Sequence, residues 1–201
     1  MADILSKRNY KVKAVVTKES SGMGGWLEKT PALTDEEFIS TISTNTVNLV
    51  NGIGQLPHSR LREEIYLKYT ELGYTFLNVI SEDSHISPSS TISDGVQIMP
   101  RVVVQPNVFL GCNTIINTGS IVEHDTVIAK NCHIAPGVVI CGGVSIGAST
   151  CIGAGATIIQ GVTIGDRCIV GAGCIITKNI KAGQICYPPR YHVADIKHRS
   201  F

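Results

Sequence analysis

The chain has 201 residues, a formal net charge of +1 and a hydrophobic content of 43%, which suffices for one sizeable core or one core beside a smaller domain. It contains no long basic or acidic run, so the charge pattern does not favour a nucleic-acid groove or an anionic membrane surface as partner. No apolar stretch approaches the roughly 20 uncharged residues of a membrane helix, and the N-terminus lacks signal-peptide anatomy. The seven cysteines form no Cys-x-x-Cys pair, which argues against a zinc cage or a disulfide framework and favours a reducing, cytoplasmic compartment.

Residues 1–84 indicate a small α/β domain. We expect helices over 2–8, 34–42 and 59–72, and strands over 12–16, 47–50 and 76–80. Thr34 with Glu37 forms a capping-box pattern at the start of the second helix, and Gly73 stops the third, whose apolar stripe is Leu61, Ile65 and Tyr69. Alternating strands and helices favour a parallel sheet.

From residue 86 onward the sequence repeats every six residues, without insertion or slip. Sixteen large aliphatic residues mark this period: Ile86, Ile92, Ile98, Val104, Leu110, Ile116, Val122, Ile128, Ile134, Ile140, Ile146, Ile152, Ile158, Ile164, Val170 and Ile176. Four positions after most of them comes a small or medium residue, such as Val96, Cys132, Cys168 or Cys174, and glycine often follows the aliphatic directly. The pattern predicts stacked coils of short strands, with the large residue inward, the small one near each corner, and glycine supplying unusual backbone conformations.

This period resembles that of the hexapeptide-repeat family, whose fold is a left-handed parallel β-helix with three six-residue sides per coil, usually assembled as a trimer. We therefore expect a mainly β protein with three segments: the α/β domain at 1–84, a β-helix at 85–182 and a C-terminal tail at 183–201. The resemblance implies an acyltransferase and a homotrimer.

A more specific resemblance rests on the segments Asn117–Asp125, His133–Gly137 and Cys141–Gly143. They are similar to a subfamily of nucleotide-sugar N-acetyltransferases and sialic-acid O-acetyltransferases, whose members also carry an α/β domain before the β-helix. The resemblance implies acetyl-CoA as co-substrate and a sugar as acceptor, most simply the amine of a nucleotide-linked sugar in bacterial glycan biosynthesis. Sialic-acid-type O-acetylation is the alternative.

Acetyl transfer from a thioester needs a base for the nucleophile, a group that orients that base, and donors for the oxyanion. By resemblance His124 is the base, a role for which imidazole is suited near neutral pH, and Asp125 is its acidic partner. No covalent intermediate on the protein is required, so the cysteines need not act as nucleophiles.

Further candidates follow from stacking and from the resemblance. With eighteen residues per coil, Gly142 is expected one coil beyond His124, where its N–H suits an oxyanion. Another column runs through Pro136, Ala154, Ala172 and Arg190, and we expect Gly142, Ala154 and Ala172 to line a groove for the pantetheine arm, although corner geometry alone also explains these small residues. By resemblance Asn117 and His133 contact cofactor or substrate across a subunit boundary; a surface role for His133 is equally open. Gly54, in the Gly52-Ile53-Gly54 loop, is a candidate nucleotide contact.

One departure from the family concerns the start of the chain. Members usually begin with a strand and a Gly-rich loop ending in Gly-His that contacts the nucleotide, whereas this sequence starts at the helix that would follow that loop. We therefore expect a Rossmann-like domain that either is truncated at its start or handles the nucleotide differently, and nucleotide specificity stays open.

Two other classes of function compete with acetyl transfer. A γ-class carbonic anhydrase uses the same fold but needs three zinc-binding histidines, two of them five residues apart, while His124 and His133 are nine apart. We therefore expect no metal. A non-catalytic scaffold is the remaining alternative, and CoA binding with turnover separates it from an enzyme.

Overall fold

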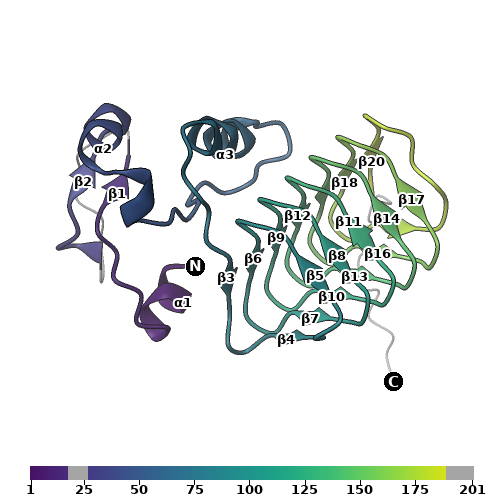
Figure 1. The fold of residues 1–201 in the computed structure, drawn as a ribbon. Helices are drawn as coiled ribbons and strands as arrows, with labels where there is room; N and C mark the ends of the chain where they lie inside the picture. Colours follow the sequence, from purple (N-terminus) through teal and green to yellow (C-terminus); the bar gives the residue numbers. More distant parts are fainter. Residues whose placement is uncertain (18–26, 189–201) are drawn as a thin grey trace, which may run out of the picture.

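The computed structural model describes residues 1–17 and 27–188. Most of it is a stack of two-residue parallel strands, with the helices at one end and along one edge of the stack (Figure 1). The strands form three parallel sheets, here named the first, second and third faces. The first face contains β3 (Val79–Ile80), β6 (Gln97–Ile98), β9 (Ile115–Ile116), β12 (His133–Ile134), β15 (Cys151–Ile152), β18 (Ile169–Val170) and β20 (Ile185–Cys186). The second contains β4 (His85–Ile86), β7 (Val103–Val104), β10 (Ile121–Val122), β13 (Val139–Ile140), β16 (Thr157–Ile158) and β19 (Ile175–Ile176). The third contains β5 (Thr91–Ile92), β8 (Phe109–Leu110), β11 (Val127–Ile128), β14 (Ser145–Ile146) and β17 (Thr163–Ile164).

Each coil passes through the three faces in turn and returns above itself after eighteen residues, so that Ile121 pairs with Val103 on one side and Val139 on the other. Four-residue turns join the faces, and we name these corners by the faces they connect: corner 1–2, corner 2–3 and corner 3–1. The fold is a left-handed β-helix, and the fold class expected from the six-residue period is confirmed. Strands of the first face occur as early as β3 and as late as β20.

The inward positions are those that the period predicts. The large aliphatic residues from Ile98 to Ile176 are all buried, and Ile86 and Ile92 of the first coil are partly buried against them. The second predicted set is buried too, including Cys132, Cys168 and Cys174. Two buried side chains per six residues therefore fill the interior, which is a close-packed core and no channel.

The glycines that follow the large aliphatic residue were expected to supply unusual backbone conformations, but in the structure they leave room for the neighbouring coil. A Cβ on Gly147 would lie 2.5 Å from the backbone nitrogen of Asp166 in the next coil, and one on Gly153 would lie 2.5 Å from that of Ala172. These glycines permit close approach of successive coils at ordinary φ. Left-handed φ values occur two positions further on in the turns, where several residues are asparagine or aspartate, which tolerate that region.

The N-terminal part is less regular than expected. Its elements are α1 (Ala2–Lys7), β1 (Val15–Val16), β2 (Ala32–Leu33), α2 (Asp35–Thr41), the 3₁₀-helix η2 (Thr44–Thr46) and α3 (Leu61–Glu71). The capping box of Thr34 and Glu37 is present, and β1 and β2 form a parallel pair. The strand expected over 47–50 is reduced to one bridge between Leu49 and Phe76, where the Leu49 N–H donates to the Thr75 carbonyl and the Leu77 N–H donates to the Leu49 carbonyl.

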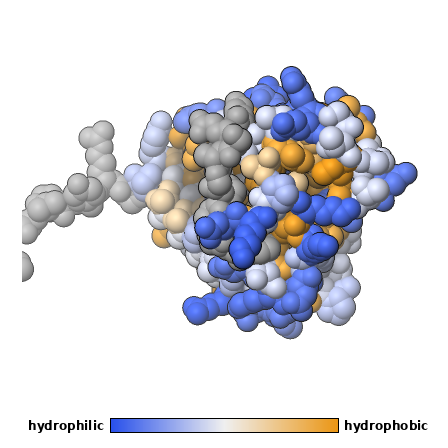
Figure 2. All heavy atoms as spheres, turned by 90° about the vertical axis from the view of Figure 1, so that its left-hand side faces the viewer, coloured by the Kyte–Doolittle hydropathy of each residue, from blue (hydrophilic) through white to orange (hydrophobic). Residues whose placement is uncertain are grey.

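The prediction of an apolar stripe on α3 is also wrong in part. Tyr69 is buried and Ile65 packs beside it, but Leu61 is 38% exposed, and the residue that α3 buries most deeply in its first turn is Arg62. At the other end of this part, Ile4 and Leu5 of α1 pack with Val79, and so cover part of the first coil. Figure 2 views this end and shows hydrophobic residues in the middle with hydrophilic ones around them.

The packing of the coil interior generates a stability prediction. Ile140 is fully buried, whereas Ile175, also on the second face, points outward and is 69% exposed. Ile140→Ala should lower the free energy of unfolding by about 2–5 kcal/mol, because it removes apolar contacts and leaves a cavity. Ile175→Ala is the matched control and should change it by less than about 1 kcal/mol in the isolated subunit. Chemical denaturation of both variants measures the difference, and equal losses would contradict the inward assignment.

Candidate active site

A histidine and an aspartate form an ion-pair geometry on corner 2–3, between β10 and β11. The Nδ1 atom of His124 lies 2.8 Å from Oδ2 of Asp125, and both side chains are more than half exposed. Because the carboxylate accepts, we assign the proton of the neutral ring to Nδ1. That assignment leaves the Nε2 lone pair free to accept a proton from a bound molecule.

The Asp125 carboxylate has a second partner that the sequence did not suggest. Its Oδ1 atom accepts a hydrogen bond of 3.1 Å from the side-chain amide of Asn107. The hydrogen bonds from His124 and then from Asn107 hold the pKa of Asp125 below its ordinary value. Asn107 precedes Asp125 by eighteen residues, so the coil period contained the signal that could have found it.

Gly142 lies one coil beyond His124 on the same corner. A Cβ at this position would lie 2.7 Å from both Cε1 and Nε2 of the His124 ring, so only glycine allows the ring its present place. Among the described residues no acceptor takes the Gly142 N–H. The imidazole of His124 and a glycine whose N–H has no acceptor in the described part of the chain therefore lie side by side.

Three other predicted residues lie on a different corner. Asn117, Ala154 and Ala172 belong to corner 1–2, where both alanines are exposed and Asn117 accepts a 2.8 Å hydrogen bond from the Thr118 N–H. Within one chain a whole strand of the second face separates them from Gly142, which is on corner 2–3. They do not form one continuous column with Gly142, because twelve residues span two thirds of a coil. Arg190, the expected end of the alanine column, lies outside the described residues.

His133 points outward from β12 on the first face and is partly buried. Burial lowers the pKa of this imidazole, and the positive charge of Arg62 lowers it further. Both effects favour the neutral form of the His133 imidazole, which lies near α3, away from the corner that carries His124.

The loop that contains Gly54 runs along the first face. Gln97 donates to the Asn51 carbonyl at 2.7 Å, and Arg62 Nη1 donates to the carbonyls of Asn51 and Ile53 at 3.0 and 2.6 Å. Gly54 itself is exposed, and a Cβ there would have no atom within 4 Å. The loop is fixed at its base and open at Gly54, which suits contact with a ligand.

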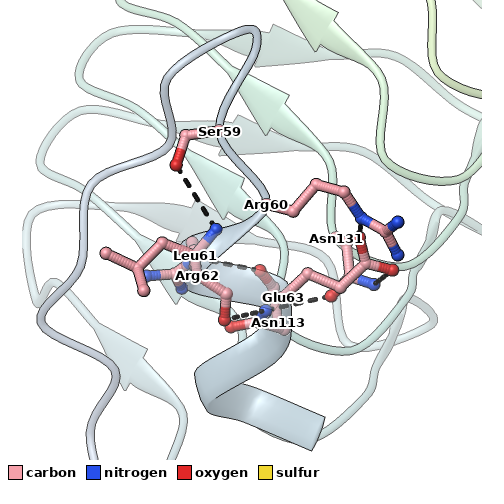
Figure 3. A network of polar contacts seen from close by, with 7 residues as sticks. All are labelled: Ser59, Arg60, Leu61, Arg62, Glu63, Asn113 and Asn131. Atoms are coloured by element: carbon pink, nitrogen blue, oxygen red, sulfur yellow. Dashed lines mark hydrogen bonds and ion pairs between the residues drawn. The ribbon is translucent and has the colours of Figure 1, made fainter.

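Arg62 is the residue that joins α3 to the β-helix, and sequence periodicity missed it. Its side chain is 1% exposed, its Nε donates to the Asn113 carbonyl at 3.3 Å, and burial lowers its pKa to about 10. Figure 3 shows the first turn of α3 over corner 3–1, where Asn113 donates to Asn131 at 2.9 Å and Asn131 donates to Glu63 at 3.2 Å. These contacts hold the first turn of α3 against the coils that carry His124 and His133.

Other features of the described part of the chain bear on its chemistry. All seven cysteines are free thiols. Within residues 1–17 and 27–188 no group of three His, Cys, Asp or Glu side chains is arranged to hold a metal ion. Over the same residues, every helix is too short or too polar to cross a membrane.

Comparison with known proteins gives consistent results. The family described as "Bacterial transferase hexapeptide (six repeats)" matches residues 107–142 and again 143–178, while a search of curated proteins finds no match. Among solved structures, a mutant of perosamine N-acetyltransferase from Caulobacter crescentus, in complex with CoA and GDP-perosamine, is 28% identical, with a TM-score of 0.81 over 91% of this chain and 85% of that one.

Two further structures share the whole architecture. The acetyltransferase domain of PglB from Neisseria gonorrhoeae, in complex with acetyl coenzyme A, is 25% identical with a TM-score of 0.82, covering 92% of this chain and 87% of that one. WeeI from Acinetobacter baumannii is 26% identical with a TM-score of 0.79, covering 92% and 88%. The six-residue period, the family match over residues 107–178 and these likenesses together identify the protein as an acyltransferase built on a left-handed β-helix, with repeats similar to those of the hexapeptide transferases.

Proposed function

We propose that this protein transfers the acetyl group of acetyl-CoA to the amine of a nucleotide-linked amino sugar. The observation that carries the proposal is the His124–Asp125 pair with the Gly142 backbone against the imidazole, where the Gly142 N–H has no acceptor among the described residues. Two of the similar structures were solved with CoA and GDP-perosamine or with acetyl coenzyme A, which supports the same classes of substrate here.

In this mechanism His124 acts as the general base. Asp125 holds Nδ1–H, so Nε2 accepts a proton from the sugar amine as its nitrogen attacks the thioester carbonyl. The new nitrogen–carbon bond forms, the carbon–sulfur bond breaks, and the proton on Nε2 passes to the departing CoA thiolate. Asp125, kept ionised by its hydrogen bonds, stabilises the imidazolium between these two transfers.

Gly142 supports the same step by its backbone. Among the described residues its N–H has no acceptor, and a Cβ on Gly142 would touch the His124 ring, so this backbone lies close enough to the imidazole for its N–H to donate to the oxyanion that would develop on the thioester carbonyl. A larger side chain would occupy the space of the imidazole. The glycine therefore serves both the donor and the position of the base.

A trimer would unite the predicted residues that lie on separate corners. The second face presents mostly apolar residues to the outside: Val103, Ile121, Val139 and Ile175. If three second faces meet around a threefold axis, burying these side chains, corner 2–3 of each subunit adjoins corner 1–2 of the next. His124 and Gly142 of one subunit would then face Asn117, Ala154 and Ala172 of its neighbour, with CoA between them. His133 and Gly54 lie on the adjoining first face, where the nucleotide sugar would bind.

The first prediction about activity concerns the base. His124→Ala should reduce kcat by roughly 10²–10⁴-fold, with the KM for acetyl-CoA little changed, because proton transfer acts in the transition state. Asp125→Asn should fall between this variant and the wild type, since its effect passes through the imidazole. Thiol release, measured with acetyl-CoA and a panel of nucleotide-linked amino sugars and sialic acids, provides the assay and distinguishes amine from hydroxyl acceptors. Near-normal kcat in His124→Ala would exclude this mechanism, and absence of both CoA binding and turnover would favour a scaffold.

A second prediction tests the glycine beside the base. Gly142→Ala should displace the His124 ring and lower kcat by about 10²-fold, as expected when a catalytic group moves by about 1 Å. Gln160→Ala is the matched control, because Gln160 occupies the same column one coil further on and is exposed. Stopped assays at saturating acetyl-CoA give kcat for both variants. Equal rates for the two would separate Gly142 from the chemistry.

The shared site predicts complementation between inactive variants. Ala172→Trp should block the CoA groove on corner 1–2 without altering His124, while His124→Ala leaves that groove intact. In randomly mixed trimers about one quarter of the sites would combine two intact corners, so co-expression should restore roughly that fraction of wild-type activity. A mixture without activity, or a fully active monomer by light scattering, would contradict a site between subunits.

A further inference from the structure

The carboxylate beside His124 is held from both sides, and the second contact comes from the preceding coil. Oδ2 of Asp125 faces Nδ1 of His124 at 2.8 Å, while Oδ1 accepts from the Nδ2 of Asn107 at 3.1 Å. In the described part of the chain the Asn107 side chain hydrogen-bonds to Asp125 and forms no hydrogen bond with the imidazole. Its route to the chemistry is therefore the carboxylate.

We propose that Asn107 is a positioning residue that fixes the Asp125 carboxylate and thereby the orientation and tautomer of His124. The inference rests on the proposed role of His124 as the base. It adds a third member, one coil away, to the pair that the sequence suggested.

The contact follows from the geometry of the coil. Asn107 and Asp125 occupy the same turn position one coil apart, and both have left-handed backbones, with φ of 60° and 59°. The same arrangement occurs independently on corner 3–1, where Asn113 and Asn131, with φ of 57° and 58°, are joined by an Nδ2-to-Oδ1 hydrogen bond of 2.9 Å. Stacked left-handed residues thus direct a side-chain donor of one coil into an acceptor of the next.

Backbone contacts fix both ends of this arrangement. The Asn107 N–H donates to Ser89 Oγ at 3.3 Å, and the Asp125 N–H donates to the Pro106 carbonyl at 3.1 Å. These contacts leave only the side-chain torsions of Asn107 and Asp125 to be fixed, and the hydrogen bond between the two side chains restrains those torsions. The Asn107 amide is therefore held in place before any ligand binds.

The chemical consequence concerns an exposed carboxylate. The Asp125 side chain is 58% exposed, so without a second partner it could rotate about its terminal torsion, for which wells are broad. With Oδ1 engaged by Asn107, Oδ2 stays aligned with Nδ1 of His124. The amide also helps to keep Asp125 ionised, because its hydrogen bond lowers the pKa of that carboxyl. An ionised, oriented acceptor favours the Nδ1–H tautomer, which leaves Nε2 available.

The decisive variant is Asn107→Gly, because glycine adopts a φ of 60° freely while alanine would add backbone strain. Losing one hydrogen bond of ordinary strength should lower kcat about three- to tenfold, with the KM for acetyl-CoA unchanged. Asn107→Asp keeps the shape but replaces the donor by a second carboxylate, so its kcat should fall at least as far at neutral pH. Arg167→Gly is the matched control: Arg167 is exposed, has a φ of 53° and lies on corner 3–1, so kcat should not change.

A readout without substrate separates this inference from the proposed function. In ¹⁵N NMR of the imidazole, Asn107→Gly should reduce the Nδ1–H tautomer of His124, and ¹³C titration should show a higher pKa for Asp125. Unchanged tautomer and kcat would overturn the role of Asn107 while leaving His124 as the base. A tautomer shift in a protein whose wild type transfers no acetyl group would overturn the enzymatic function and leave Asn107 as the residue that orients the ring.

Discussion

The rest of the structure depends on the parallel pairing of each strand with the one eighteen residues later. This register stacks identical turn positions above one another, so residues far apart in local sequence become neighbours at a corner. Asn107, Asp125 and Gly143 share one such column, and His124 and Gly142 share the adjacent one. The chemistry proposed for the site thus depends on these columns, because each residue in a column contacts the residues one coil before and after it.

The second organising contact is made by the buried guanidinium of Arg62, which lies between the N-terminal part and the β-helix. Arg62 donates to the carbonyl oxygens of Asn51 and Ile53, in the loop that precedes α3, and to that of Asn113 in the β-helix. Among the described residues no carboxylate forms an ion pair with it. Its Nη2 atom also has no partner there. A guanidinium is costly to bury without a counter-ion, yet its fixed fork lets one side chain bind several carbonyl groups at defined angles. Here that fork fixes the position of the Gly52–Gly54 loop over the first face.

Sequence reasoning succeeded where one strict period controls the structure. The inward aliphatic residues and the position of Gly142 above His124 follow from counting in sixes and eighteens, and the Thr34 capping box is a local signal. It was less successful before residue 79, where no period exists: a strand became the single Leu49 bridge, and Arg62 took the buried place expected for an apolar neighbour. Counting does not bring the alanines of corner 1–2 beside Gly142 within one chain, because they occupy a different third of the coil, so the groove expected for these residues stays a proposal that requires a neighbouring subunit. Contacts across subunits depend on surfaces that a single-chain pattern does not encode.

The same period has a consequence for how such a protein can change in length. An insertion of six residues between His124 and Gly142 would keep every aliphatic side chain inward, yet it would rotate all later coils by one third of a turn. Gly142 would then leave the corner that carries His124. An insertion of eighteen residues further along would add one complete coil and leave every later residue on its own corner. Folding therefore tolerates insertions and deletions in multiples of six, whereas the proposed active site tolerates only whole coils, so a change in length can separate His124 from Gly142 without disturbing the core.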